Sequence, residues 1–306
     1  MTDLIAAQVR VPCSTSNLGS GYDTIGLALD RYLDASFTPH SGGGIVLERT
    51  GTLSLLDETQ EPDLVATFFE RHLAQHNLTP SGTLRLHSEI PVARGLGASA
   101  AAVVAGHELA YAVRGVPGDG EETFTAAVHF EGHGDNVAPS VFGGLRAVAT
   151  TPGGPVVMSL KLSNEVGFAY AAPAAGISTR MARELLPKQI PHGVAATSLG
   201  RLVALVHGLA QGNPELIRIG VHDQLHVPYR LPLIPGVVAA MSAATDAGAW
   251  AVTISGSGSG LLAMCEPSQA DGVAAAMHEI FDADVGDPEC VGFSVRPCPK
   301  GIQRVP

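Results

Sequence analysis

Lysine is scarce in this chain of 306 residues. It occurs three times, as Lys161, Lys188 and Lys300, and none of these residues lies in a glycine-rich segment. The Gly-Lys-Ser/Thr ending of a P-loop is therefore missing, which excludes that class of phosphate site. Basic residues number 18 against 29 acidic ones, for a net charge of −11. Because proteins that bind nucleic acids present a basic face, this balance argues against a nucleic-acid partner.

Cysteines and long apolar runs are also few. The four cysteines lack the spacing of a metal finger, and the first residues lack the pattern of a secretion signal, so we interpret them as reduced thiols of a cytoplasmic protein. They are Cys13, Cys265, Cys290 and Cys298. The longest apolar region, roughly residues 96–113, is interrupted by His107 and Glu108, which argues against a membrane partner. A hydrophobic content of 45% is typical of a soluble globular protein, and the length allows two domains.

Hydrophobic periodicity predicts strands and helices in both halves of the chain. The predicted strands are 7–11, 30–37, 44–49, 83–87, 166–172, 250–255, 261–265 and 291–295. The predicted helices are 62–77, 98–113, 121–130, 178–186, 195–211, 235–247 and 270–281. This mixture indicates an α+β fold and not a doubly wound parallel sheet. Glycine and proline clusters at 143–144 and 151–155 mark a domain boundary, which we place between residues 155 and 156.

The most informative segment is Pro91-Val-Ala-Arg-Gly-Leu-Gly-Ala-Ser-Ala-Ala101. Gly95 and Gly97 can take backbone angles closed to other residues and let a ligand approach the main chain. The helix predicted to follow begins with free N–H groups at the positive end of its dipole. A glycine-rich turn ahead of a helix is typical of a phosphate-binding site.

Two other glycine-bearing segments lie far from this loop. They are Val11–Asp23, which is rich in serine, threonine and asparagine, and Ser255–Gly260, which alternates serine and glycine. Taken singly, each has an ordinary interpretation, as a polar loop or as a hairpin turn.

Taken together and in this order, the three segments resemble the motifs of the GHMP kinases, and within that superfamily the chain looks most like the homoserine kinases. The pattern Pro-x-Ser/Thr-x-x-Asn-Leu-Gly-x-Gly-Phe-Asp matches residues 12–23, and Pro-x-x-x-Gly-Leu-Gly-Ser-Ser-Ala-Ala matches residues 91–101. Segments that separate homoserine kinases from their relatives match residues 131–139, 178–187 and 228–230. The resemblance therefore covers nearly the whole chain.

The resemblance implies a two-domain GHMP kinase fold. Residues 1–155 would form the N-terminal, ATP-binding domain with a left-handed β-α-β crossover, and residues 156–306 a ferredoxin-like C-terminal domain. ATP and a small-molecule substrate would bind in the cleft between them, and relatives often form homodimers. The chain departs from the family pattern at Ser20, Tyr22, Ala98 and the pair Ser259-Gly260.

By this resemblance the glycine loop holds the triphosphate of ATP. Its residues are Pro91, Arg94, Gly95, Leu96, Gly97, Ala98, Ser99, Ala100 and Ala101. The Ser99 hydroxyl and the Glu131 carboxylate would bind Mg²⁺, which prefers hard oxygen ligands. Ala98 stands where the family has serine, and the missing hydroxyl removes a hydrogen bond of about 0.5–1.5 kcal/mol.

The resemblance also indicates which residues bind the carboxylate and the ammonium group of an amino-acid substrate. Arg183 and Arg230 stand where the family binds the substrate carboxylate, and arginine offers the bidentate geometry that this group needs. Asn17 and Asp23 are suited to accept hydrogen bonds from the ammonium group, and His133 adds a polar contact.

Thr179 and Asp135 complete the expected chemistry. Thr179 lies four residues before Arg183, hence on the same helical face, so its hydroxyl would point toward the transferred phosphoryl group. In related kinases the aspartate that matches Asp135 works as a base beside a lysine of the first motif, which this chain lacks. A loose transition state needs little prior deprotonation, so we assign Asp135 with Glu131 and Thr179 to catalysis as an orienting group, with general base as the alternative.

The sequence therefore predicts an enzyme that phosphorylates the hydroxyl of L-homoserine with ATP, a step of threonine biosynthesis. One alternative is a kinase for another small hydroxy acid, such as threonine. Another is a non-catalytic member that senses nucleotide or amino acid. Retention of Ser99, Glu131, Thr179 and Asp135 argues against the sensor, which needs no metal ligands.

A pair of histidines, His222 and His226, has the i, i+4 spacing of the zinc-protease His-Glu-x-x-His helix. The acidic residue between them is the shorter Asp223, and Pro228 would end such a helix at once. We therefore predict no zinc site there.

Overall fold

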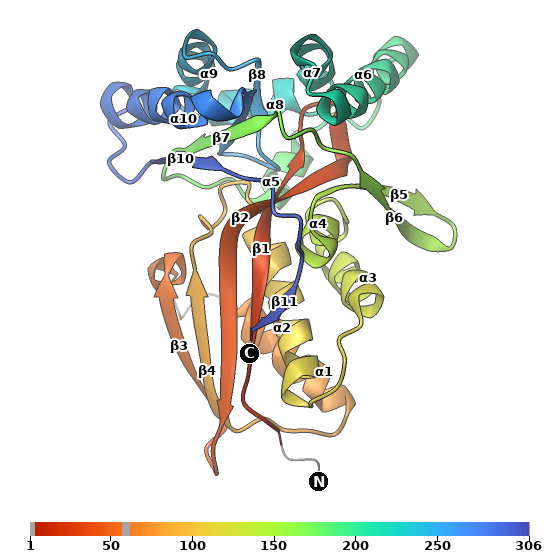
Figure 1. The fold of residues 1–306 in the computed structure, drawn as a ribbon, viewed down its shortest axis with the longest axis vertical. Coiled ribbons are helices and arrows are strands. Elements are labelled where there is room, and N and C mark those ends of the chain that lie inside the picture. Colours follow the sequence, from red (N-terminus) through yellow and green to blue (C-terminus); the bar gives the residue numbers. More distant parts are fainter. Residues whose placement is uncertain (1–3, 57–61, 306) are drawn as a thin grey trace.

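The computed structural model describes residues 4–56 and 62–305, and in these residues the chain forms two β-sheets with helices packed against them (Figure 1). The first sheet and its helices fill the lower half of Figure 1. The second sheet lies above it, with α6, α7, α9 and α10 at the top of the view. The predicted α+β class is confirmed.

The first sheet has the strand order β11-β1-β2-β4-β3, with β5 paired to β2 and β6 paired to β5. Its strands are β1 (Ala7–Asn17), β2 (Gly21–Pro39), β3 (Ile45–Gly51), β4 (Gly82–Ser88), β5 (Leu145–Thr151), β6 (Gly154–Leu160) and β11 (Gln303–Val305). β3 and β4 are parallel and joined through a helix, while the other pairings are antiparallel. β1 was predicted to end at Pro12 but continues to Asn17, with a register shift after Pro12 that accommodates the missing N–H.

Four helices accompany this sheet: α1 (Leu64–Gln75), α2 (Ala98–Val113), α3 (Gly120–Glu131) and α4 (Val137–Phe142). The Asp63 carboxylate caps α1 by accepting a hydrogen bond from the Ala66 N–H at 3.1 Å. Helix α2 is buried along most of its length, because it packs between α1 and strands β1 and β2. Its first residue, Ala98, is the one that the sequence predicted.

The second sheet has the order β10-β7-β9-β8, all antiparallel, which is the strand order of a ferredoxin-like β-α-β-β-α-β unit. Its strands are β7 (Gly167–Ala172), β8 (Ala251–Ile254), β9 (Leu261–Cys265) and β10 (Val291–Val295). Its helices are α5 (Thr179–Glu184), α6 (His192–Gln211), α7 (Pro214–Val221), α8 (Val227–Arg230), α9 (Val237–Asp246) and α10 (Ala270–Glu279). Alternate residues of β7 point to two hydrophobic clusters, with Phe168 and Tyr170 in one and Ala169 and Ala171 in the other.

The proline–glycine cluster at 151–155 forms a hairpin turn. Thr151 pairs with Gly154, so the cluster joins β5 to β6 within the first sheet. The predicted boundary between residues 155 and 156 therefore falls inside β6. β11 also returns to the first sheet from the end of the chain (Figure 1).

Helix α6 has the length and mean hydropathy of a membrane span, the one such helix in the described residues when single helices are considered. Of its apolar window, 22% is buried in the structure. The side chains of Leu199 and Val203 are 67% and 69% exposed, while Leu205 and Leu209 pack into the core.

Two buried histidines link the helices of the first half. Arg114 Nη1 donates to His72 Nε2 at 3.2 Å, His72 Nδ1 lies 3.3 Å from His107 Nε2, and His107 Nδ1 lies 3.3 Å from Thr123 Oγ1. An arginine can only donate, so His72 is neutral with its proton on Nδ1. Burial, together with His107, His76 and Arg114, lowers the pKa of His72 to about 4. Burial also lowers the pKa of His107.

We expect the melting temperature to fall by a few degrees between pH 7 and pH 5. Because the pKa of His72 is depressed on folding, its contribution is complete above the unfolded value of 6.5 and is lost as the pH falls toward 4. Scanning calorimetry should show a smaller fall for His72→Gln, while His207→Gln, at an exposed histidine on α6, should keep the wild-type dependence. Equal falls in all three proteins would contradict this account.

Candidate active site

The three glycine-bearing segments, far apart in the sequence, meet at one place. The Ser14 N–H donates to the Leu96 carbonyl at 3.2 Å, which joins β1 to the glycine loop. The Gly256 N–H donates to the Ser16 carbonyl, also at 3.2 Å, which joins β1 to the turn after β8. These contacts bring together the segments on which the sequence prediction depends.

A buried hydroxyl connects all three segments at once. Ser255 Oγ donates to the Gly95 carbonyl at 2.7 Å, so its lone pairs are left for Thr15 Oγ1, 2.9 Å away. Gly95 has φ of +81°, and a Cβ on it would lie 2.0 Å from the Ser255 carbonyl oxygen. Only glycine fits where these two segments of the chain cross so closely.

The glycine loop opens onto a cavity of about 440 Å³ that lies between the two halves of the chain. Of the residues predicted for the loop, those that line the cavity are Gly95, Leu96, Gly97, Ala98 and Ser99, and Val92 and Ala93 of the same segment line it as well. Among the described residues no side chain caps the start of α2. The first N–H groups of this helix therefore make no hydrogen bond to a capping side chain. A phosphate group fits such a helix start.

The other four residues predicted for this loop do not line the cavity. Ala100 and Ala101 belong to the first turn of α2 and are buried in the core, and Pro91 lies before the turn. The guanidinium group of Arg94 instead donates to the Glu289 carbonyl at 3.2 Å.

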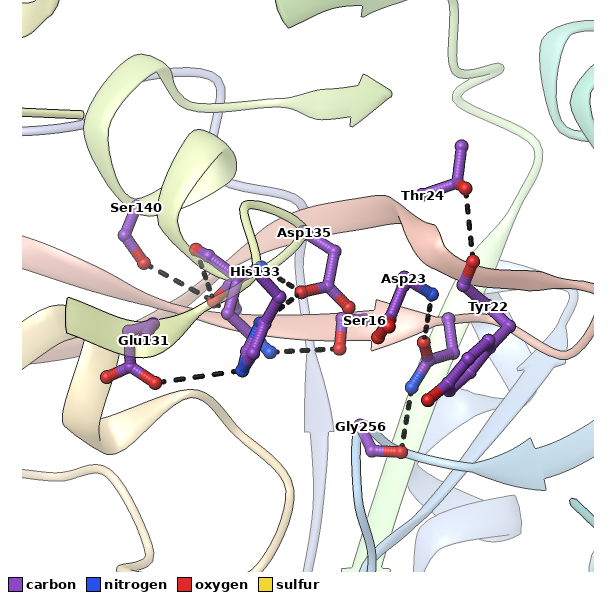
Figure 2. Close-up of polar contacts among 12 residues, drawn as sticks. Ser16, Tyr22, Asp23, Thr24, Glu131, His133, Asp135, Ser140 and Gly256 are labelled. Atoms are coloured by element: carbon purple, nitrogen blue, oxygen red, sulfur yellow. Dashed lines mark hydrogen bonds and ion pairs between the residues drawn. The ribbon is translucent and has the colours of Figure 1, made fainter. Parts of the chain in front are cut away.

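Glu131, His133 and Asp135 stand together on the segment that joins α3 to α4 (Figure 2). His133 Nδ1 is 2.6 Å from Asp135 Oδ1, and His133 Nε2 is 3.7 Å from Glu131 Oε2. The Asn136 N–H also donates to Asp135 Oδ1 at 3.0 Å. All three predicted residues line the cavity.

The electrostatics of this group favour an ionised Asp135. Burial alone would raise its pKa, but His133, Ser16 and the Asn136 N–H outweigh burial and lower it. Burial would likewise lower the pKa of His133, and Asp135 and Glu131 raise it instead. A carboxylate with a lowered pKa is a weak base.

Glu131 differs from Asp135 because its neighbours do not fully offset the effect of burial on its pKa. Its Oε1 is buried without a hydrogen-bond partner among the residues that the structure describes. Burial raises the pKa of Glu131, and the Ser99 hydroxyl opposes that effect. An orphaned carboxylate oxygen beside a hydroxyl is a hard-oxygen donor set of the kind that Mg²⁺ prefers.

The two predicted arginines also line the cavity. Arg183 forms a bidentate ion pair with Asp23, with both N···O distances 2.8 Å, and its Nη1 also lies 3.3 Å from the Tyr22 hydroxyl. Arg230 is almost fully buried, and its Nη1 donates to the Gly256 carbonyl at 3.2 Å. Asn17 Nδ2 donates to the same carbonyl at 2.8 Å.

Thr179 lies at the start of α5. Ser178 caps this helix, because its Oγ accepts a hydrogen bond from the Met181 N–H at 3.2 Å. Thr179 and Arg183 both line the cavity, in keeping with their spacing of four residues.

Sequence reasoning missed several residues of the cavity. Ser16 accepts a hydrogen bond from Asn136 Nδ2 at 2.9 Å. Each of the two is the neighbour in sequence of a predicted site residue, Asn17 or Asp135. The cavity also has an apolar wall near β3, β4 and α1. No sequence motif indicates this wall, because its residues come from separate segments that meet only in the folded chain. Its side chains include Leu33, Leu53, Val65 and Ile90.

The zinc hypothesis for His222 and His226 finds no support in the described residues. α7 ends at Val221, so the two histidines do not share a helix. The one cluster of possible metal ligands found in the described residues is His72, His107 and Glu122, which lies in the helical layer of the first half.

Family models match two parts of the chain. The description "GHMP kinases N terminal domain" fits residues 63–144, and "GHMP kinases C terminal" fits residues 205–283. Together these segments cover more than half of the chain.

Individual relatives match over most of their length. The homoserine kinase of Microchaete diplosiphon is 37% identical over 91% of this chain and 91% of its own. That of Synechococcus sp. strain RCC307 is 38% identical over 96% and 93%. The crystal structure of homoserine kinase from Cytophaga hutchinsonii superimposes with a TM-score of 0.85 at 28% identity, covering 98% of this chain and 97% of that one. A mevalonate kinase from L. major shares the fold alone, with a TM-score of 0.69 at 15% identity over 97% of each chain.

We expect Gly95→Ala to weaken ATP binding at least tenfold and to lower the melting temperature. The added Cβ would meet the Ser255 carbonyl at 2.0 Å and the backbone would be held at a positive φ. Titration calorimetry with ATP measures the first effect. Gly200→Ala, where a Cβ meets nothing within 4 Å, is the matched control and should leave binding unchanged. Normal affinity in Gly95→Ala would show that the crossing is not needed for the loop.

Proposed function

This chain belongs to the GHMP kinases, and from that premise we propose that it phosphorylates the side-chain hydroxyl of L-homoserine with ATP, giving O-phospho-L-homoserine. This is a reaction of threonine biosynthesis. The observation that carries the proposal is a single cavity lined by a glycine loop with a helix start and by two arginines. The loop and helix start suit a triphosphate, and the arginines suit a carboxylate.

At the phosphate end, the backbone N–H groups from Gly95 to Ser99 hold the negative oxygens without a lysine. We infer that Ser99 and Glu131 hold Mg²⁺, because the orphaned Glu131 oxygen needs a cation or a donor. Bound Mg²⁺ neutralises the charge that develops on the transferred group.

At the substrate end, we infer that Arg183 and Arg230 bind the carboxylate of the amino acid. Asn17 and Asp23 bind its ammonium group, and His133 contributes a polar contact. This orientation places the side-chain hydroxyl of homoserine toward Asp135, Thr179 and the loop, since all of these line the same cavity. Positioning of this kind provides much of the rate in phosphoryl transfer.

Asp135 acts in this proposal by orienting the hydroxyl. Its lowered pKa makes it a carboxylate at neutral pH and a weak base, and the adjacent His133 fixes its position at 2.6 Å. A loose transition state needs no strong base in advance of the transfer. General-base catalysis by Asp135 is the alternative.

We further infer that the enzyme is a cytoplasmic homodimer. All four cysteines are free and buried, which suits a reducing compartment. The exposed apolar side chains of Leu199 and Val203 on α6 give a second copy of the chain a surface to cover.

We expect turnover of homoserine with Mg-ATP in a coupled ADP-release assay, and little with threonine, serine, mevalonate or galactose. Arg183→Ala and Arg230→Ala should each raise the KM for homoserine about tenfold or more, because each removes one hydrogen-bonded contact between the enzyme and the substrate carboxylate. The KM for ATP should stay unchanged. Turnover of threonine instead would favour the other hydroxy-acid kinase. Nucleotide binding without any turnover would favour the sensor.

We expect Asp135→Asn to keep the KM for homoserine and lower kcat. A fall of about tenfold fits an orienting carboxylate, whereas a general base contributes about 10²–10⁴-fold. The steady-state rate as a function of homoserine concentration separates the two quantities. An unchanged kcat would remove Asp135 from the mechanism.

A further inference from the structure

Arg230 carries one of the largest fully buried side chains of the protein. A buried guanidinium group needs acceptors for its N–H groups, because an unpaired buried charge is very costly. Nε donates to the Ala182 carbonyl at 3.3 Å, and Nη1 donates to the Gly256 carbonyl at 3.2 Å and to His226 Nδ1 at 3.2 Å. These contacts use Nε and Nη1, and the same guanidinium group lies over the Tyr22 ring, with Cζ 5.4 Å from the ring centroid.

The contacts of His226 determine its tautomer. Its Nε2 lies 3.0 Å from the Gly19 carbonyl oxygen, which can only accept, so Nε2 must carry the proton. Its Nδ1 faces Arg230, which can only donate, so Nδ1 must be the acceptor. Both contacts are satisfied together only by the neutral imidazole with hydrogen on Nε2.

The charges around His226 agree with this state. Burial and Arg230 lower the pKa of the ring, whereas Asp223, the Gly19 carbonyl and Asp23 raise it, and the net direction is down. A protonated ring would place an N–H of Nδ1 against the cationic Arg230, which is repulsive.

We propose that His226 is a positioning residue that holds the Arg230 guanidinium group at the angle in which it meets the substrate carboxylate. The imidazole bridges the Gly19 carbonyl of the first motif and Arg230, residues from the two halves of the chain. This inference deepens the proposed function and rests on it.

His226 is itself held by Asp223 and by Tyr22, so that it can act as a fixed support. The Asp223 carboxylate accepts hydrogen bonds from the N–H groups of Leu225, His226 and Val227, at 2.9, 2.7 and 2.8 Å. The Tyr22 ring stacks on the imidazole with centroids 5.0 Å apart. Without His226, Nη1 of Arg230 would keep one hydrogen bond, to the Gly256 carbonyl, and the guanidinium group would be less firmly held.

Two amide variants separate the halves of this bridge. In His226→Asn the amide oxygen lies near the position of Nδ1 and can accept from Arg230, but the side chain is too short to reach Gly19. In His226→Gln the amide nitrogen lies near the position of Nε2 and can donate to Gly19, but the acceptor for Arg230 is lost. His222→Gln, at an exposed histidine on the same segment, is the matched control.

We expect His226→Gln to raise the KM for homoserine about tenfold, with kcat and the KM for ATP little changed, and His226→Asn to stay within about threefold of wild type. In an Arg230→Ala background, His226→Gln should add nothing further, because the residue through which it acts is gone. Melting temperatures of all variants establish that each one folds.

Three results would overturn the proposal. The first is equal KM changes in the Asn and Gln variants, which would indicate packing alone. The second is a full additional effect of His226→Gln in the Arg230→Ala background. The third is an unchanged KM in His226→Gln while wild type turns over homoserine. If wild type itself does not turn over homoserine, the proposed function fails first and this inference fails with it.

Discussion

The buried hydroxyl of Ser255 is the contact on which the site depends. It receives a hydrogen bond from Thr15 at the end of β1 and gives one to Gly95 in the glycine loop, joining segments up to 240 residues apart. Thr15 and Ser255 are both fully buried. Loss of either partner would leave a polar group unpaired, at a cost of about 1–3 kcal/mol. The loop geometry at the phosphate end is thus fixed by residues outside the loop.

The adjacent Gly256 carbonyl extends this constraint to the substrate end. It accepts hydrogen bonds from Asn17 and from Arg230, which come from different halves of the chain. Since Ser255 and Gly256 are neighbours, one turn sets the position of the glycine loop and of the arginine together. The turn at Ser255 and Gly256 therefore links the glycine loop to Arg230 through hydrogen bonds of two successive residues.

Local patterns were enough to predict much of this architecture, and they failed where distant partners decide the outcome. The start of α2 at Ala98 and the cap at Ser178 follow from glycine and serine chemistry within a few residues. Pro12 was read as a strand end, but pairing with β2 carries β1 past it. The cluster at 151–155 was read as a domain boundary, because a hairpin turn and a linker share the same composition. His226 looked at most like an unlikely metal ligand, because its partner Gly19 is 207 residues away.

The ion pair between Arg183 and Asp23 has a consequence for selectivity. About a third of each side chain remains in contact with solvent, so the pair is only weakly stabilising and can exchange partners. It presents one positive and one negative group inside the cavity before any ligand arrives. In the proposed function, a molecule that carries both a carboxylate and an ammonium group would replace each partner with its equivalent, and no charge would be left unpaired. An amine without the acid, or an acid without the amine, would break the ion pair and restore only one of its two partners. The pair would therefore select against such molecules before the shape of the hydroxylated side chain is tested.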